Sequence, residues 1–225
     1  MIQLIKKDIL MLRKTLLFAI IYPAIFILSF QSMGSAAIFS MSVIAVTYIL
    51  ILTAVAYDDK NKSDILLNSL PIGRARIVLS RYLSIYVFSA IGIVYYFIFY
   101  ILIKISGFPL KLYPVTFVEV FIVLFAATLL NSIYFPIFFK LGYIKSKIIN
   151  FVLFFAVFFG ISTAVSFIKD ISKNGSDFSK FILSIIDTIN SLSSFQIVIC
   201  IFMIMIIIFA ISYMLSMKFY KNREF

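Results

Sequence analysis

The chain of 225 residues contains no histidine and a single cysteine. Without histidine it can form neither a Ser-His-Asp triad, nor an HExxH zinc site, nor any other imidazole-ligated metal centre. Cys200 has no second cysteine in the chain with which to form a disulfide or a zinc cluster. The commonest hydrolytic and metal-dependent chemistries are therefore excluded, and we expect no catalytic residues and no metal site.

Glycine is also scarce, and none of the seven glycines belongs to a GxxxxGK[ST] sequence. The chain therefore has no P-loop with which to bind a nucleotide. We expect a protein that is not itself an enzyme and binds no cofactor directly. Any energy that it uses has to come from another subunit.

Apolar residues, in contrast, are abundant: 64% of the chain is hydrophobic and the mean hydropathy is +1.15. A soluble domain has only ~45–50% apolar residues, so most of this chain is expected to lie in lipid. We predict an all-α polytopic membrane protein that forms a single domain, residues 1–225. Six apolar runs approach the ~20 residues needed to cross a bilayer: Thr15–Phe30, Ala36–Ala56, Leu83–Ile103, Val115–Phe139, Ile148–Ile168 and Ile197–Met217.

The first of these runs has a competing interpretation. It is short, contains Pro23 and follows a basic start, as a secretory signal peptide would. However, the run exceeds the usual ~7–15 residues of a signal-peptide apolar core, and another span follows at once. We therefore predict six transmembrane helices.

The distribution of positive charge predicts the orientation. Fifteen of the 20 lysine and arginine residues lie on one side of the six spans and five on the other. By the positive-inside rule, we expect both termini and the loop 57–82 to be cytoplasmic. The net charge of +11 does not indicate nucleic acid, because the basic residues flank apolar spans instead of forming one soluble patch. Membrane lipid is the expected partner of these charges.

Ionisable side chains within the spans are nearly absent, so a proton relay or a sodium site is poorly supported. Glu119 lies near the outer end of the fourth span, where it can reach the interface. Thr128 and Asn131 lie deeper in that span. They either form hydrogen bonds between helices or line a substrate pathway as its polar residues.

Two segments outside the spans have apolar residues at helical spacing. Residues 1–14 are predicted to form an interfacial helix before the first span. In the external loop, residues 169–195, an amphipathic helix precedes the last span and is either an external gate or a passive interfacial helix. The candidate gate residues are Phe178, Phe181, Ile182, Ile185 and Ile186.

The loop 57–82 is the one long charged insertion and the most informative part of the sequence. Acidic residues followed by isoleucine and leucine predict a short helix that Pro71 and Gly73 end. A second helix is predicted to start near Arg74 and to continue into the third span. Apolar residues on a charged cytoplasmic helix need a partner, either lipid or protein. We favour protein, because the acidic start of the loop is repelled by anionic lipid.

This loop resembles the permeases of type 2 ABC exporters, the ABC-2 family. Small six-span members have a consensus close to acidic-E-K-N-K…LL-x-S-L-P-[VI]-x-R-x-x-I-V-x-[SA]-[KR]-Y at this place. The similarity extends to the N-terminal helix, the six spans and the external helix, and so covers nearly the whole chain. The matching residues are Asp58, Asp59, Lys60, Asn61, Lys62, Leu66, Leu67, Ser69, Leu70, Pro71, Ile72, Arg74, Ile77, Val78, Ser80, Arg81 and Tyr82.

The resemblance implies that the loop is a coupling helix seated in a cleft of a separate ABC ATPase, which binds the ATP and Mg²⁺. It also implies that two six-span permeases, identical or paralogous, assemble with two ATPases. The implied coupling residues are Asp58, Asp59, Lys60, Asp64, Leu66, Leu67, Leu70, Pro71 and Arg74.

Within the family, the compact chain is similar to the permeases of phenol-soluble-modulin exporters and related systems. This similarity implies export of amphipathic or antimicrobial-type peptides. The alternative is a membrane scaffold or immunity protein that binds its target without transport.

Overall fold

The computed structural model describes residues 2–29, 35–107, 114–153, 155–156 and 193–222. These residues form helices joined by short connections, with no strand among them, as the sequence predicts. The helices in chain order are α1 (Ile2–Met11), α2 (Arg13–Ala19), α3 (Ile21–Ser29), α4 (Ser35–Lys60), α5 (Ser63–Ser69), α6 (Arg74–Ser106), α7 (Phe117–Leu141) and α10 (Ser194–Lys221). Residues 143–153 are also helical.

Four of these helices, α4, α6, α7 and α10, are long and apolar enough to cross a membrane. They coincide with the second, third, fourth and sixth predicted spans. As predicted, α6 starts at Arg74 and continues without a break through the third span. Its 33 residues extend for about 50 Å at 1.5 Å per residue, well beyond a hydrocarbon core of ~30 Å. The surplus lies partly at its first turns, next to the loop that contains α5.

The two remaining predicted spans, the first and the fifth, do not appear as single long helices among the described residues. The first span is divided into α2 and α3, and α1 is bent by 69° from Arg13–Ser29, so the two segments together form at most one broken span. Most of the fifth predicted span, Ile148–Ile168, lies outside the described residues. The described helices thus provide four spans, or five with the bent pair, and the count of six stays a prediction.

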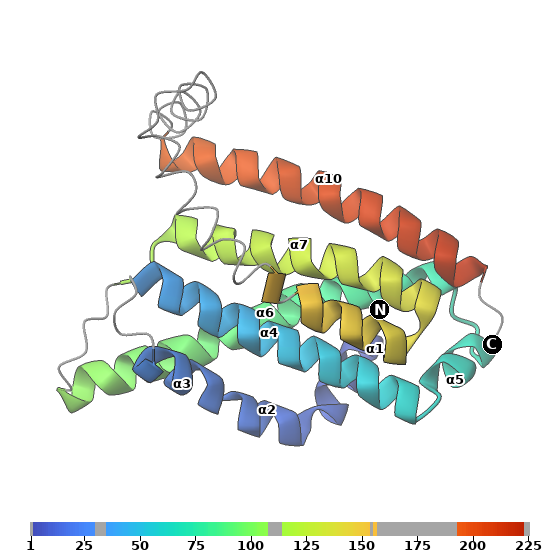
Figure 1. The fold of residues 1–225 in the computed structure, drawn as a ribbon, viewed down its shortest axis with the longest axis horizontal. Helices are drawn as coiled ribbons and strands as arrows, with labels where there is room; N and C mark the ends of the chain where they lie inside the picture. Colours follow the sequence, from blue (N-terminus) through green and yellow to red (C-terminus); the bar gives the residue numbers. More distant parts are fainter. Residues whose placement is uncertain (1, 30–34, 108–113, 154, 157–192, 223–225) are drawn as a thin grey trace.

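The four long helices run side by side, with α10 along α7 and α4 along α6 (Figure 1). Aromatic rings fill the space between them at the end nearer α5. The ring of Tyr82 lies 5.0 Å from that of Phe135 and 5.1 Å from that of Phe209, centroid to centroid. Tyr220 of α10 similarly packs against Phe139 of α7, at 5.2 Å. Rings from three different helices therefore lock this end of the bundle together.

Towards the other end of the bundle, α4 and α6 come close at Gly92. A Cβ atom at this position would lie 3.2 Å from Cγ1 of Val43 and 3.3 Å from its carbonyl oxygen. Glycine thus permits a backbone approach that larger residues prevent. Phe39 and Tyr96 pack edge to face nearby, with ring centroids 5.0 Å apart. These contacts belong to a second buried cluster, separate from the one around Tyr82.

Glu119, the acidic residue at the edge of the fourth predicted span, lies in the first turn of α7. The Glu119 side chain accepts a hydrogen bond from the backbone N–H of Thr116 at 2.9 Å. The Thr116 hydroxyl in turn accepts one from the Glu119 N–H, which completes a capping box. Ser193 and Gln196 form the same arrangement at the start of α10. Glu119 therefore has a structural role at a helix end.

Candidate coupling site

The loop between α4 and α6 folds into the short helix α5, which lies across one end of the bundle (Figure 1). Lys62 adopts a left-handed backbone conformation (φ 48°) that separates α4 from α5. Leu70 is extended, and Pro71 follows it, so the helix ends after seven residues. This confirms the predicted order of short helix, break and long helix.

Three of the four isoleucine and leucine residues between positions 65 and 70 face outward. The exposed fraction is 55% for Ile65, 64% for Leu66 and 49% for Leu70, whereas Leu67 is buried against the bundle at 7%. We call the three exposed side chains the α5 ridge. Such a ridge on a surface outside the spans is a typical site of protein contact.

Charged residues stand on both sides of the α5 ridge. Asp59, Lys60 and Lys62 are exposed at the end of α4 and the turn after it, and Arg74 and Arg76 are exposed at the start of α6. The side chain of Asp64 lies outside the described residues. An apolar centre with a polar, charged rim is the usual composition of a protein interface.

Asp58 differs from its neighbours because its side chain is buried, with 4% exposed. It forms ion pairs with Arg81 of α6 and with Lys7 of α1, the latter at 2.7 Å between Nζ and Oδ1. Arg81 also donates a hydrogen bond to Asp8 at 2.9 Å, and Lys7 lies 3.2 Å from Asp8. Two acids and two bases thus form one closed group, which we call the four-charge cluster.

The burial of the four-charge cluster has an energetic consequence. Arg81, Asp8 and Asp58 have side-chain exposures of 8%, 5% and 4%, while Lys7 retains 30%. Buried charges are tolerated only when they are paired, because each one loses its hydration. The cluster therefore requires α1, the end of α4 and the start of α6 to keep their positions relative to one another.

The loop is also attached to the C-terminal end of α10. The Asn68 side chain donates a hydrogen bond to the Tyr220 hydroxyl at 3.0 Å, and Arg74 Nη1 donates to the Lys221 carbonyl at 2.8 Å. Leu67 and Tyr220 belong to the same buried cluster. The α5 ridge therefore belongs to a loop that ion pairs connect to α1 and hydrogen bonds connect to α10.

Tyr82, the last residue of the loop motif, connects three spans. Its hydroxyl lies 2.5 Å from the Ser212 hydroxyl and 2.7 Å from that of Ser216, both on α10. Ser212 also donates a hydrogen bond to the carbonyl of Ser132 on α7, at 2.5 Å. A displacement of the start of α6 would therefore also move the parts of α7 and α10 that are bonded to it.

The other predicted site residues divide into two groups. Thr128 is buried and donates its hydroxyl hydrogen to the Leu124 carbonyl of its own helix, and the Tyr86 hydroxyl of α6 lies 3.3 Å from the same oxygen. Asn131 donates to the Ala127 carbonyl. These bonds give both residues a structural role, and a pathway role stays a prediction. The candidate gate residues Phe178, Phe181, Ile182, Ile185 and Ile186 lie outside the described part of the chain.

Sequence reasoning missed Asp8, Asn68 and Tyr220, and it gave Arg81 no partner. One signal was available, because Asp8 is the only acidic residue among the first 57 residues of the chain. A carboxylate in a basic, apolar stretch needs a specific partner if it is buried. Which partner it has, at a distance of 73 residues, is visible only in the folded chain.

Comparison with protein families agrees with this arrangement. A model described as ABC-2 family transporter protein matches residues 3–221. The chain belongs to the ABC-2 transporter family. This confirms the resemblance seen in the loop motif, and it makes the chain a multi-pass membrane subunit of the kind that pairs with an ABC ATPase. Searches of curated proteins and of solved structures gave no match to this ABC-2 permease.

Within the described ranges, no group of three or more aspartate, glutamate, cysteine or histidine side chains could hold a metal ion.

Proposed function

We propose that this ABC-2 permease is the transmembrane subunit of a bacterial exporter and that the α5 ridge docks into a cleft of its ATPase. The observation that carries the proposal is the combination of three exposed apolar side chains on α5 with a firm attachment to α1 and α10. An element that transmits motion has to contact the motor and be rigidly joined to the parts that move. The α5 ridge offers an exposed apolar surface for the first requirement, and the attachments to α1 and α10 support the second.

The roles of the predicted coupling residues follow from their positions. Leu66 and Leu70 supply apolar contact, while Asp59, Lys60 and Arg74 lie at the charged rim. Asp58 and Leu67 are internal and hold α5 in place. Pro71 follows the end of α5, and Asp64 is assigned to the site by family resemblance alone.

The wider assembly is part of the same proposal. Two six-span permeases, identical or paralogous, would enclose the pathway, with both termini on the side of the ATPase. The charge bias of the loops supports this orientation. The similarity to phenol-soluble-modulin exporters supports amphipathic or antimicrobial-type peptides as the exported substrates. A non-transporting scaffold or immunity protein is the competing function.

Substitution of Leu66 by aspartate tests the proposal. A Leu side chain that becomes fully buried contributes roughly 1.5–3 kcal/mol, and a buried unpaired carboxylate adds a further cost. We therefore expect Leu66→Asp to weaken co-purification with the ATPase by at least about tenfold and to abolish export. Since Leu66 is 64% exposed, the fold of the permease itself should persist.

The matched control is Ile105→Asp, an exposed apolar residue near the opposite end of α6, 79% exposed. It should leave ATPase binding intact. Normal ATPase binding and full export by the Leu66→Asp protein would show that α5 is not the docking element. ATPase binding without any substrate-dependent transport in the unaltered protein would favour the scaffold.

A further inference from the structure

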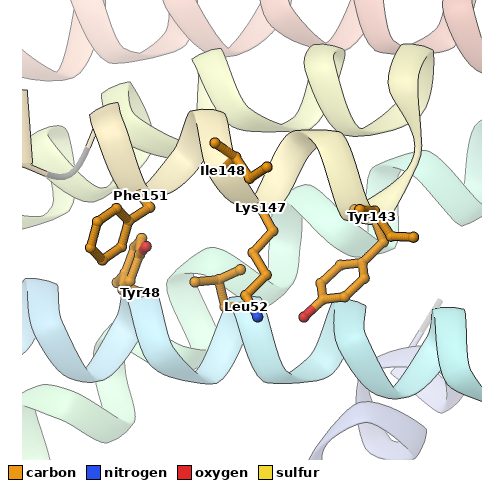
Figure 2. Close-up of a pocket in the computed structure, with 7 residues that line it drawn as sticks. Tyr48, Leu52, Tyr143, Lys147, Ile148 and Phe151 are labelled. Carbon is orange, nitrogen blue, oxygen red and sulfur yellow. The ribbon is translucent and has the colours of Figure 1, made fainter.

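A groove lies between α4 and the helical segment 143–153, away from the coupling loop contacts (Figure 2). Its main cavity has a volume of about 520 Å³, and a side lobe of about 240 Å³ shares Leu52, Tyr143 and Lys147 with it. The lining is apolar apart from one ammonium and two phenol groups. The residues that line the main cavity are Tyr48, Leu52, Tyr143, Ile144, Lys147, Ile148 and Phe151.

The polar groups of the groove lie mainly at the end nearer the coupling loop. Lys147 extends from segment 143–153 towards Leu52 on α4, and Tyr143 lies beside it (Figure 2). Because α4 runs towards α5, Leu52 lies closer to the coupling loop than Tyr48 does. Tyr143 follows directly after α7 and lies at that end too, whereas Phe151 and Tyr48 face each other further along the bundle. One end of the groove is thus cationic and phenolic, and the other is aromatic.

Lys147 is available for an anion. Its ammonium lies 6.0 Å from the centroid of the Tyr143 ring, and none of the ion pairs formed by the described residues involves it. The stretch 140–147 contains three lysines and no acidic residue. Lysines in such a stretch attract anionic lipid to the membrane surface beside them.

We propose that this groove binds one anionic phospholipid of the leaflet on the coupling-loop side. Lys147 and the Tyr143 hydroxyl hold the phosphate, and an acyl chain lies along Leu52, Ile148 and Phe151. The exposed fractions of Ile148 and Phe151 are 64% and 57%, so the chain would enter from the bilayer without crossing a barrier. Tyr143 is suited to this level of the membrane, since its ring is apolar and its hydroxyl is polar.

Size and charge favour a lipid over the other occupants. An α-helix about 10–12 Å in diameter fills about 520 Å³ with roughly one turn, so the cavity is too small for an amphipathic peptide helix. A second copy of the chain in this groove would have to place a surface of its own against the lysine-rich stretch 140–147. An acyl chain with a phosphate matches both the apolar lining and the cation.

The experiment measures lipid binding to the full-length permease by native mass spectrometry in detergent, with phosphatidylglycerol and phosphatidylcholine as probes. We expect one tightly bound phosphatidylglycerol per chain, bound about fivefold more weakly by Lys147→Ala and retained by Lys147→Arg. Lys145→Ala is the matched control, because Lys145 is exposed on the same segment but does not line the groove. Leu52→Trp, which fills the cavity without a change of charge, should also displace the lipid.

Each alternative predicts a different result. Equal losses in Lys147→Ala and Lys145→Ala would reduce the effect to general surface charge and overturn the proposal. Full competition by glycerol phosphate alone would show an anion site that does not need an acyl chain. A dimer that Leu52→Trp dissociates, with no bound lipid, would assign the groove to a second copy. None of these measurements involves the ATPase, so they are independent of the proposed coupling role.

Discussion

The four-charge cluster leads to the most specific prediction, which concerns Arg81. Replacement of Arg81 by leucine leaves the buried carboxylates of Asp8 and Asp58 with only Lys7, which is 30% exposed and contributes less than a buried base. Removal of one partner from a buried ion pair typically costs ~3–5 kcal/mol, because the other charge stays buried without compensation. We expect a loss of stability in this range for Arg81→Leu.

The cost should be recovered when the carboxylates are neutralised as well. In Arg81→Leu combined with Asp8→Asn and Asp58→Asn, no unpaired charge remains buried. The triple variant should therefore be more stable than Arg81→Leu alone, a non-additivity of about 0.5–3 kcal/mol per contacting pair. This pattern distinguishes the cost of burying unpaired carboxylates from the cost of losing the packing of the arginine side chain.

The assay measures the stability of the detergent-solubilised permease as denaturant or heat unfolds it. Arg76→Leu is the matched control, because this arginine is exposed on the same helix, and its effect should stay within about ±0.5 kcal/mol. A stability loss of Arg81→Leu no larger than that of Arg76→Leu would refute the assignment of a buried cluster. So would a triple variant less stable than Arg81→Leu.

Three further predictions concern topology and packing. In a Cys200→Ser background, Ser106→Cys should react with an impermeant maleimide in intact cells, whereas Asn61→Cys should react only after lysis. Both sites are exposed, so labelling of Asn61→Cys from outside would show that the predicted orientation is wrong. Gly92→Leu should separate α4 from α6 and cost about 1–3 kcal/mol, so an unchanged unfolding midpoint would contradict the close approach. Tyr82→Phe removes the hydroxyl that Ser212 and Ser216 contact, and Ser212 keeps its bond to the Ser132 carbonyl. We expect a cost of about 1–3 kcal/mol, and a stabilised variant would contradict the hydrogen-bond network.

The sequence determined those features that depend on neighbouring residues and on composition. The membrane environment follows from the 64% of hydrophobic residues, because such a surface cannot be covered in water. The long helices follow from apolar runs that approach the thickness of the bilayer. The break between α5 and α6 follows from Pro71 and Gly73, and the family follows from the loop motif, which is a local pattern.

The tertiary structure decided which of these residues face outward. The loop motif presents Leu66 and Leu67 as equivalent, but they differ in exposure, 64% against 7%, because only Leu67 belongs to the buried core. It likewise presents Asp58 and Asp59 as one acidic pair, yet only Asp58 meets Arg81 and Lys7. Consecutive positions on a helix point in directions about 100° apart, and the partners of each come from distant segments. Burial and ion pairing therefore depend on contacts between distant parts of the chain, which no local pattern contains.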